Sequence, residues 1–375
     1  LHKLFVENQV VLVKLNSVNE YLAEFLATAL APLIGPGFLR IGTGDAAVGQ
    51  YLCSHPLVET IHITGSGAAH DAIVWGAGSD KTGPPRNPRP ISSELGGVSP
   101  TIVVPGPWSA ADLAYHGELV ASQKLNNAGF NCIACQVLVL AAAWPQRNDF
   151  LAGVRTALAQ SAPRPLYYPG ASARLADWQH GLGMDAPAPT STNQCPVLSF
   201  RAGENAIAEN FEVFAPALGV TELPGDDPAA FLRAAIAYAN QHLAGTLGAN
   251  ILIHPKTMKQ IGRANFEVLI ADLRYGTIAI NSWTALGFGT PQASWGAFPG
   301  HTLADVQSGI GFVHNSYMFD RPERTVLEAP FRAPFRPPWF ISHRRAHVLG
   351  RLMLQFQYRP SLGQLPQIMW NAIKG

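Results

Sequence analysis

Hydrophobic residues near the start of the chain change from a continuous run to a helical spacing. Val10 to Val13 are consecutive apolar residues, a pattern that predicts a strand buried on both faces of a parallel sheet. Ser17 and Glu20 form a capping box, which predicts the start of a helix. Helical spacing continues through Leu22, Phe25, Leu26, Ala29, Leu30 and Leu33. The prolines and glycines between Pro32 and Gly37 are expected to end this helix.

The alternation of strands and helices continues and predicts an α/β fold with a doubly wound sheet. The expected elements are a helix around Val48 to Cys53, a strand at Thr60 to Thr64, a helix from near Ala68, a strand at Thr101 to Val104, and a helix capped by Ser109 and Asp112 that runs towards Leu125. A second α/β region is expected over about Val137 to Asn281, with a loop at Met184 to Pro196. Asp80 to Pro90 is expected to be a surface loop.

The end of the chain differs in composition from the rest. Beyond Asp320 it is rich in arginine, proline and aromatic residues, and we expect a tail that wraps on the surface of the body. Arginines lie among apolar residues from Arg344 to Arg359, which predicts one amphipathic helix. We expect this helix to pack on the body or on a neighbouring subunit, and a membrane-surface anchor is the less favoured alternative.

Composition indicates a folded protein of ordinary charge. Only 14% of the 375 residues are charged while 47% are hydrophobic, which favours a large core over disorder. The net charge of +1 gives no overall field that would attract nucleic acid or acidic lipid. Four cysteines are fewer than a disulfide-held secreted chain of this size usually has, so we expect a reducing compartment, the cytoplasm. The longest apolar run, Val137 to Trp144, is far shorter than the roughly 20 residues that cross a bilayer.

Cys132 and Glu94 are candidates for chemistry, although neither is decisive alone. Cys132 follows a glycine-containing turn, whose backbone N–H groups can stabilise a thiolate, but a free cysteine is more often a small buried apolar residue. Cys132 and Cys135 could form a redox pair, yet no second CxxC motif accompanies them and we expect no metal site. Glu94 precedes two glycines, which suits a base that swings towards a water, whereas an isolated loop acid is more often only solvated.

Together these segments resemble the signature segments of the aldehyde dehydrogenase superfamily. Glu94-Leu-Gly-Gly followed by Asn127-x-Gly-x-x-Cys132-x-Ala is similar in order and approximate separation to the two catalytic segments of that family. Other segments agree with family patterns: Ile63-Thr-Gly65-Ser66 with F-T-G-S, Glu212-Val-Phe214-Ala-Pro216 with E-x-F-G-P, Gly276 to Asn281 with G-x-x-x-x-N, and Lys14 with the lysine of K-P-x-E. Several matches in the right order are far more specific than any single motif.

The resemblance implies an aldehyde-dehydrogenase-like fold, with a partial Rossmann-type cofactor domain and an α/β catalytic domain. Residues 1–93 would be the remaining part of the dinucleotide-binding domain, 94–300 the catalytic thiol domain, and 301–375 the C-terminal segment and tail. Cys132 would attack an aldehyde, with its own backbone N–H as a donor to the oxyanion. A hydride would pass to NAD or NADP, and Glu94 would activate the water that hydrolyses the thioester.

The resemblance also implies a cofactor site. Lys14 and Glu212 would bind the ribose groups, and Phe214 would lie on the nicotinamide side. The full set of cofactor residues would be Lys14, Ser17, Gly44, Gly49, Gly65, Ser66, Leu95, Glu212 and Phe214. Ser17 stands where the family has a glutamate that repels a 2′-phosphate, so we expect NADP to be accepted as well as or better than NAD.

The sequence departs from the family pattern at several places. Phe130 and Val98 stand where many members have glutamine and lysine, and the family's P-F-G-G-x-K-x-S-G run is not recognisable around Trp295. The chain opens on Leu1 without the family's N-terminal part, which holds the asparagine of the oxyanion hole. We therefore expect a piece of a longer protein that forms a homo-oligomer.

Two other functions stay open for this sequence. A non-catalytic scaffold or a truncated, inactive fragment would explain the lost C-terminal motif, although a scaffold needs neither Cys132 nor Glu94. A relative that transfers the acyl group to coenzyme A is disfavoured, because such enzymes commonly lack the hydrolytic glutamate.

Overall fold

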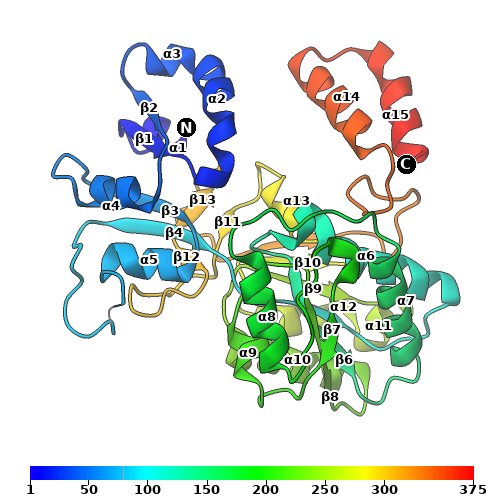
Figure 1. Ribbon diagram of the computed structural model, residues 1–375. Coiled ribbons are helices and arrows are strands. Elements are labelled where there is room, and N and C mark those ends of the chain that lie inside the picture. Colours follow the sequence, from blue (N-terminus) through cyan, green and yellow to red (C-terminus); the bar gives the residue numbers. More distant parts are fainter. Residues whose placement is uncertain (79) are drawn as a thin grey trace. The chain divides into compact units, whose positions relative to one another are not determined.

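The computed structural model describes residues 1–78 and 80–375 (Figure 1). The chain forms two compact units, one made of Leu1–Ser93 with Thr302–Asp305 and the other of Glu94–His301 with Val306–Gly375. Residues beyond 300 therefore contribute to both units. The functional division into a cofactor part and a catalytic part stays a prediction.

The first unit alternates short strands and helices, as its sequence pattern predicts. In chain order its elements are α1 (His2–Phe5), β1 (Val11–Lys14), the 3-10 helix η1 (Ser17–Leu22), α2 (Ala23–Ala29), α3 (Ala31–Ile34), β2 (Leu39–Gly42), α4 (Ala46–Ser54), β3 (Ile61–Gly65) and α5 (Gly67–Val74). β1 and β2 pair in parallel, with Val11 opposite Leu39 and Lys14 opposite Gly42. β3 lies beside β4 (Ile91–Leu95), which leads into the second unit at Glu94.

The prediction that the first strand is buried on both faces is wrong. Leu12 and Val13 in β1 are 46% and 38% exposed. β1 and β2 form a sheet of only two strands, which offers too little area for helices to cover both of its faces.

The predicted capping box at Ser17 and Glu20 is also wrong. Asn16 is the N-cap of η1, because its side-chain oxygen accepts a hydrogen bond from the Val18 N–H at 3.0 Å. Glu20 Oε1 instead accepts from the Gly44 N–H at 2.6 Å and so ties η1 to the loop before α4. An asparagine directly before the predicted cap competes for the same role, since both residue types favour that position.

The second unit is built on one parallel sheet, which confirms the predicted α/β class. Its strands are β5 (Ser99–Val103), β6 (Cys135–Ala141), β7 (Val197–Ser199), β8 (Leu218–Leu223), β9 (Gly248–Leu252), β10 (Thr277–Ile280) and β14 (Thr325–Glu328). Their order is β14-β10-β9-β5-β6-β8-β7, and every neighbouring pair is parallel. Every residue of β6 is buried, as expected for a central strand with helices on both sides.

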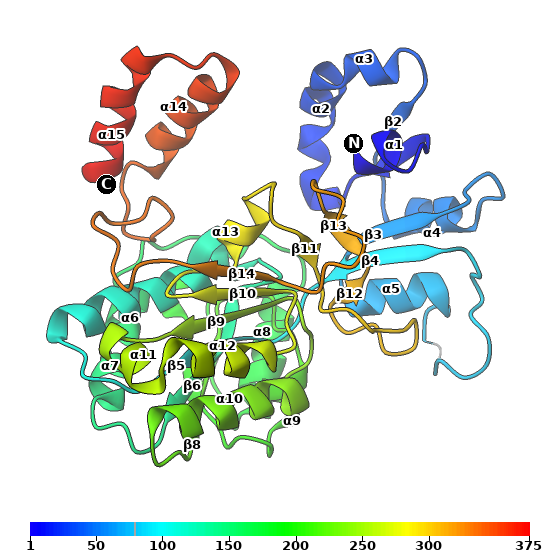
Figure 2. The same cartoon turned by 180° about the vertical axis from the view of Figure 1, so that it is seen from behind.

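Helices cover both faces of this sheet (Figures 1 and 2). α6 (Ala110–Leu125) and α7 (Arg147–Ala159) lie on one face, and α10 (Pro228–His242), α11 (Pro255–Ile261) and α12 (Arg263–Ala271) lie on the other. The predicted cap of α6 is confirmed, because Asp112 Oδ2 accepts from the Ser109 N–H at 2.8 Å and the Asp112 N–H donates to Ser109 Oγ at 3.2 Å. The remaining elements between α7 and α10 are α8 (Ala171–Gly181), η3 (Thr192–Gln194) and α9 (Ala206–Asn210).

The C-terminal region is more ordered than the predicted wrapping tail. β14 is an edge strand of the main sheet, paired with β10. α14 (Ala346–Tyr358) is the predicted amphipathic helix, with Leu349 and Leu352 buried, but it is followed by η4 (Leu362–Gln364) and a second helix, α15 (Leu365–Ile373). α14 and α15 pack against each other. Within the described residues, no helix has both the length and the apolar character required to cross a membrane.

His116 on α6 is enclosed by aromatic rings in the core. Its ring centroid lies 4.3 Å from that of Phe331, 4.9 Å from Trp108 and 5.1 Å from Tyr115, and the residue has no exposed surface. Burial lowers the pKa of His116 to about 3; the carboxylate of Asp112 opposes this shift, whereas the charges of Arg332 and His254 add to it. The folded protein therefore excludes a proton that the unfolded chain binds near pH 6.5.

We expect His116 to make the fold sensitive to acid. Stability from the neutral imidazole is present above pH 6.5 and falls as the pH decreases towards 3, by about 2 kcal/mol between pH 7 and pH 5. Urea unfolding of wild type and His116→Phe at both pH values measures the effect, with the exposed His347→Phe as control. An equal loss of stability in wild type and His116→Phe would contradict the assignment.

Candidate active site

A left-handed turn precedes Cys132. The residues of η2 (Asn126–Gly129) include Asn127, Ala128 and Gly129 with φ of +49°, +56° and +82°. The Asn127 side-chain amide donates to the Phe130 carbonyl at 3.0 Å, which stabilises a conformation that asparagine tolerates better than most residues. A Cβ on Gly129 would lie 2.9 Å from the Ala215 carbonyl carbon. Glycine is therefore required where this turn packs against the segment that carries Glu212 and Phe214.

Cys132 lies among apolar residues and close to two carboxylates. It packs with Ile133, Leu247, Trp283 and Trp295, and its thiol is free. Burial raises the pKa of the Cys132 thiol far above its ordinary value, and the carboxylates of Glu94 and Glu212 raise it further. The residue's own backbone N–H has the opposite, smaller effect. In the absence of other charges the thiol therefore keeps its proton at neutral pH.

Glu94 is a buried carboxylate near the end of β4. It is 5% exposed, and Trp295 donates its indole Nε1–H to Glu94 Oε1 at 2.5 Å. Trp295 lies in β11 (Trp295–Gly296), which pairs with β13 (Phe312–His314). The next residue, Leu95, is also buried, and its N–H donates to the Ser308 carbonyl at 2.8 Å, just before β12 (Gly309–Ile310). The structure thus brings both predicted catalytic residues, Cys132 and Glu94, together in the second unit.

Glu212 lies directly over the two glycines that follow Leu95. A Cβ on Gly96 would be only 1.8 Å from Glu212 Oε1, and the Gly97 N–H hydrogen-bonds the carboxylate. Burial raises the pKa of Glu212 to about 7, although the Gly97 N–H and the positive charges of Lys124 and Arg174 lower it. Phe214 is half-buried with φ of +43° and has its ring 5.1 Å from Tyr168.

Two side chains that the sequence did not single out hold this segment in place. The Gln136 amide donates to the Phe211 carbonyl at 2.7 Å and its oxygen accepts from the Val213 N–H at 3.0 Å, so it fixes the backbone on both sides of Glu212. Arg174 donates to the carbonyls of Val213 and Phe214. Neither residue belongs to a recognisable motif, and only their hydrogen bonds to the segment reveal the role.

Substituting Gly96 is expected to disturb both the fold and Glu212. In Gly96→Ala the new methyl group must displace the Glu212 carboxylate, at a cost of about 1–3 kcal/mol in unfolding free energy. Gly350→Ala in α14 is a matched control, because its Cβ would meet no atom within 4 Å and alanine favours helix by about 1 kcal/mol. Chemical unfolding measures both variants.

A double variant separates the contact from general strain. Glu212→Ala combined with Gly96→Ala removes the atoms that the methyl group meets. We expect this pair to recover part of the stability lost in Gly96→Ala; additive losses would show that Glu212 is not the obstacle.

The other predicted cofactor residues lie in the first unit. Lys14 ends β1, exposed Ser17 begins η1, and Gly65 and Ser66 form the turn between β3 and α5. Ser66 is the N-cap of α5, accepting from the Ala69 N–H at 3.2 Å. Their role in cofactor binding stays a prediction.

Gly44 and Gly49 have different surroundings. Gly44 has φ of +124°, and a Cβ there would lie 2.7 Å from a methyl carbon of Val48, so glycine is required. A Cβ on Gly49, inside α4, would meet nothing within 4 Å. Asp45 caps α4 by accepting from the N–H groups of Ala47 and Val48, which places a negative charge at this helix end.

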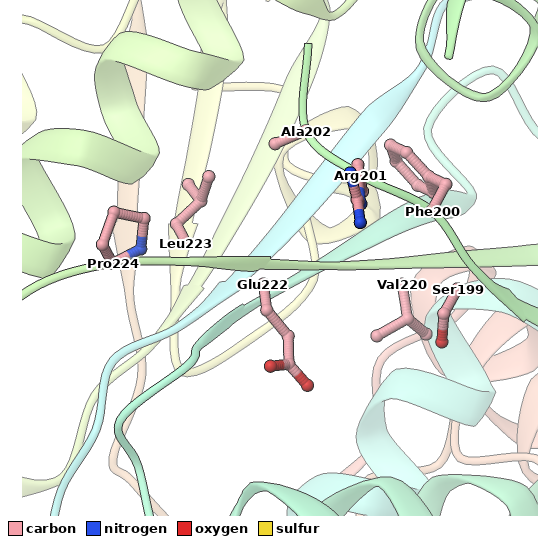
Figure 3. Close-up of a pocket in the computed structure, with 8 residues that line it drawn as sticks. All are labelled: Ser199, Phe200, Arg201, Ala202, Val220, Glu222, Leu223 and Pro224. Carbon is pink, nitrogen blue, oxygen red and sulfur yellow. The ribbon is translucent and has the colours of Figure 1, made fainter. Parts of the chain in front are cut away.

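A surface pocket lies apart from the two catalytic candidates (Figure 3). It has a volume of about 430 Å³ and is lined by Ser199, Phe200, Arg201, Ala202, Val220, Glu222, Leu223 and Pro224, at β7 and β8. Arg147 donates to Glu222 at 3.1 Å in this region. Neither Cys132 nor Glu94 lines the pocket.

Comparison with known proteins finds similarity to aldehyde dehydrogenases. Residues 3–161, which include Glu94 and Cys132, match the model of the aldehyde dehydrogenase family. Geranial dehydrogenase of Castellaniella defragrans is 36% identical over 138 residues, which are 36% of this chain and 26% of that protein.

Solved structures share the fold over most of the chain. An indole-3-acetaldehyde dehydrogenase in complex with NAD+ superposes with a TM-score of 0.65 at 22% identity, covering 83% of this chain and 61% of that one. A gamma-glutamyl-gamma-aminobutyraldehyde dehydrogenase from Burkholderia cenocepacia gives a TM-score of 0.62 at 20% identity, covering 82% and 59%. The chain thus aligns with about a quarter of its curated relative and less than two thirds of these structures. Over residues 3–161 the chain is therefore similar to the aldehyde dehydrogenase family, and solved aldehyde dehydrogenase structures share its fold.

Proposed function

We propose that the protein oxidises an aldehyde to a carboxylic acid with NAD or NADP, using Cys132 as nucleophile and Glu94 as general base. The observation that carries this proposal is the placement of the Cys132 thiol within electrostatic reach of Glu94 in a buried, apolar site. A scaffold has no need of a buried carboxylate beside a free thiol, because burying a charge costs free energy.

Each unit, taken by itself, has residues suited to bind part of a dinucleotide. Gly65 and Ser66 join a strand to the start of α5, and a Cβ at the following Gly67 would meet nothing within 4 Å, so this helix start has room for a phosphate. In the second unit, the half-buried carboxylate of Glu212 is suited to accept hydrogen bonds from ribose hydroxyls. When bound, the nicotinamide would accept the hydride.

The reaction at Cys132 follows from its surroundings. The sulfur of Cys132 would attack the aldehyde carbon while the thiol proton passes, by way of water, to the carbonyl oxygen, which gives a thiohemiacetal. Loss of a hydride to bound NAD(P)+ and of the hydroxyl proton to solvent would then leave a thioester. Glu94 then removes a proton from a water molecule that attacks the thioester carbon, which releases the acid and restores the thiol. The apolar residues around Cys132 exclude other water and so limit unproductive hydrolysis.

An aldehyde panel tests the proposal directly. Purified protein is incubated with aliphatic, terpenoid and aromatic aldehydes and with NAD or NADP, and the absorbance of the reduced cofactor is followed. Reduction with at least one aldehyde, with the matching acid as product, is expected. Absence of reduction with every aldehyde would favour the scaffold, and a requirement for coenzyme A would favour the acyl-transferring alternative.

Ser17 gives a separate expectation for cofactor choice. Its hydroxyl is exposed, and Asn16 rather than Ser17 caps the helical turn. If Ser17 replaces a glutamate that repels a 2′-phosphate, Ser17→Glu is expected to lower kcat/KM for NADP by at least about tenfold and to leave the value for NAD nearly unchanged. Equal values for NADP in both proteins would reject the role of Ser17.

We also propose a small-molecule aldehyde as the partner, a homo-oligomer as the assembly, and the cytoplasm as the compartment. All four cysteines are free thiols, which suits a reducing environment. Light scattering of the purified protein tests the assembly.

A further inference from the structure

Trp295 donates a side-chain hydrogen bond to the carboxylate of Glu94, the proposed base. Its Nε1–H donates to Glu94 Oε1 at 2.5 Å, and the two residues are 201 positions apart in the sequence. Trp295 is 1% exposed and packs in the same cluster as Cys132. The contact therefore joins a third segment of the second unit to the two that carry the nucleophile and the base.

The backbone around Trp295 leaves the indole little freedom. A Cβ on Gly276 would lie 1.9 Å from the Gly296 carbonyl oxygen, so β11 is pressed against the start of β10. The ring of Phe288, in α13 (Ala285–Phe288), stands edge-on to the indole at 5.4 Å. A Cβ on Gly287 would be 3.6 Å from the far edge of the indole ring. Packing therefore holds the indole N–H of Trp295 in place independently of its hydrogen bond to Glu94.

A fixed neutral donor has two effects on a buried carboxylate. It offsets part of the free energy lost when the carboxylate is buried away from water. It also selects one orientation of the carboxyl group, which matters because a misplaced base loses rate.

We infer that Trp295 is a positioning residue of Glu94, holding the carboxylate in one orientation near Cys132 through its indole N–H. The inference rests on the proposed role of Glu94 as base, but the contact itself can be tested without any turnover.

Indole resonances report the contact directly. The chain has eight tryptophans, so uniformly 15N-labelled protein should give eight indole N–H signals, and the one absent from Trp295→Phe belongs to Trp295. In Glu94→Gln we expect this proton signal to move upfield, because an amide oxygen is a weaker acceptor than a carboxylate. Trp283 is the matched control, since its Nε1–H donates to the Ile133 carbonyl at 3.1 Å in the same cluster. A Trp295 signal that stays in place in Glu94→Gln overturns the inference.

Kinetics then separates positioning from packing. Replacing Trp295 with β-(3-benzothienyl)alanine keeps the ring shape and exchanges only the N–H for sulfur, so the fold is preserved where Trp295→Phe could fail. We expect kcat to fall by about ten- to a hundredfold with KM little changed, because a hydrogen bond to a charged group is lost. An unchanged kcat overturns the inference. If instead Glu94→Gln is fully active while the Trp295 signal still moves, the contact stands and the proposed role of Glu94 fails.

Discussion

Cys132→Ala is expected to reduce aldehyde-dependent reduction of NAD(P) by at least about 10⁴-fold, because the covalent intermediate can no longer form. Intact-mass spectrometry should show a covalent acyl adduct on wild type and none on the variant. The measurement is an initial rate with the best aldehyde of the panel, with folding checked by circular dichroism. A small, partly buried side chain can be shortened by one atom at little cost to the fold.

Cys53→Ala is the matched control for this experiment. Cys53 lies in α4 of the first unit and is also a half-buried free thiol. Cys53→Ala should oxidise the aldehyde at the wild-type rate and should still form the acyl adduct. If Cys132→Ala oxidises the aldehyde as fast as the wild type, Cys132 is not the nucleophile.

Glu94→Gln is expected to lower steady-state kcat by about 10²–10⁴-fold, because the water that attacks the thioester loses its base. Formation of the thioester does not require that step. A single rapid turnover of cofactor reduction, equal in amount to the active sites, should therefore remain and be followed by a slow phase. Stopped-flow absorbance measures both phases.

Glu267→Gln is a suitable control, since Glu267 is an exposed acid paired with Arg263 on α12. It should preserve both phases. Loss of the rapid turnover in Glu94→Gln would show that Glu94 acts before hydride transfer, for example on the Cys132 proton. If the phase that follows the rapid turnover is as fast in Glu94→Gln as in the wild type, Glu94 is not the base.

The main sheet was accessible to sequence reasoning because its central strands are buried on both sides. A continuous apolar run such as that in β6 has one simple structural explanation. β14 escaped prediction because it is only four residues long, alternates in exposure and lies between charged and proline-rich stretches. The burial of β1 was predicted wrongly for the opposite reason. The strand has the apolar run of a central strand but belongs to a sheet of only two strands.

The residues of the candidate site also fall into two groups, those that the sequence singled out and those that only the structure revealed. Cys132, Glu94, Glu212 and Gly96 lie in short segments that resemble family motifs, so the resemblance singled them out as candidates. Trp295 was visible only as part of a run that departs from the family pattern, and its partner is 201 residues away. Such a contact depends on the complete tertiary structure, and a single sequence contains no direct signal for it.

The position of β14 also has a consequence for biosynthesis. β10 has β9 on one side and β14 on the other, and β14 is formed by residues 325–328 of a 375-residue chain. During translation the strand edge of β10 therefore stays open until β14 itself has left the ribosome. An open edge can recruit the same edge of another nascent chain. Ribosomes stalled between β10 and β14 should consequently release chains that aggregate, whereas chains that include β14 have that edge closed.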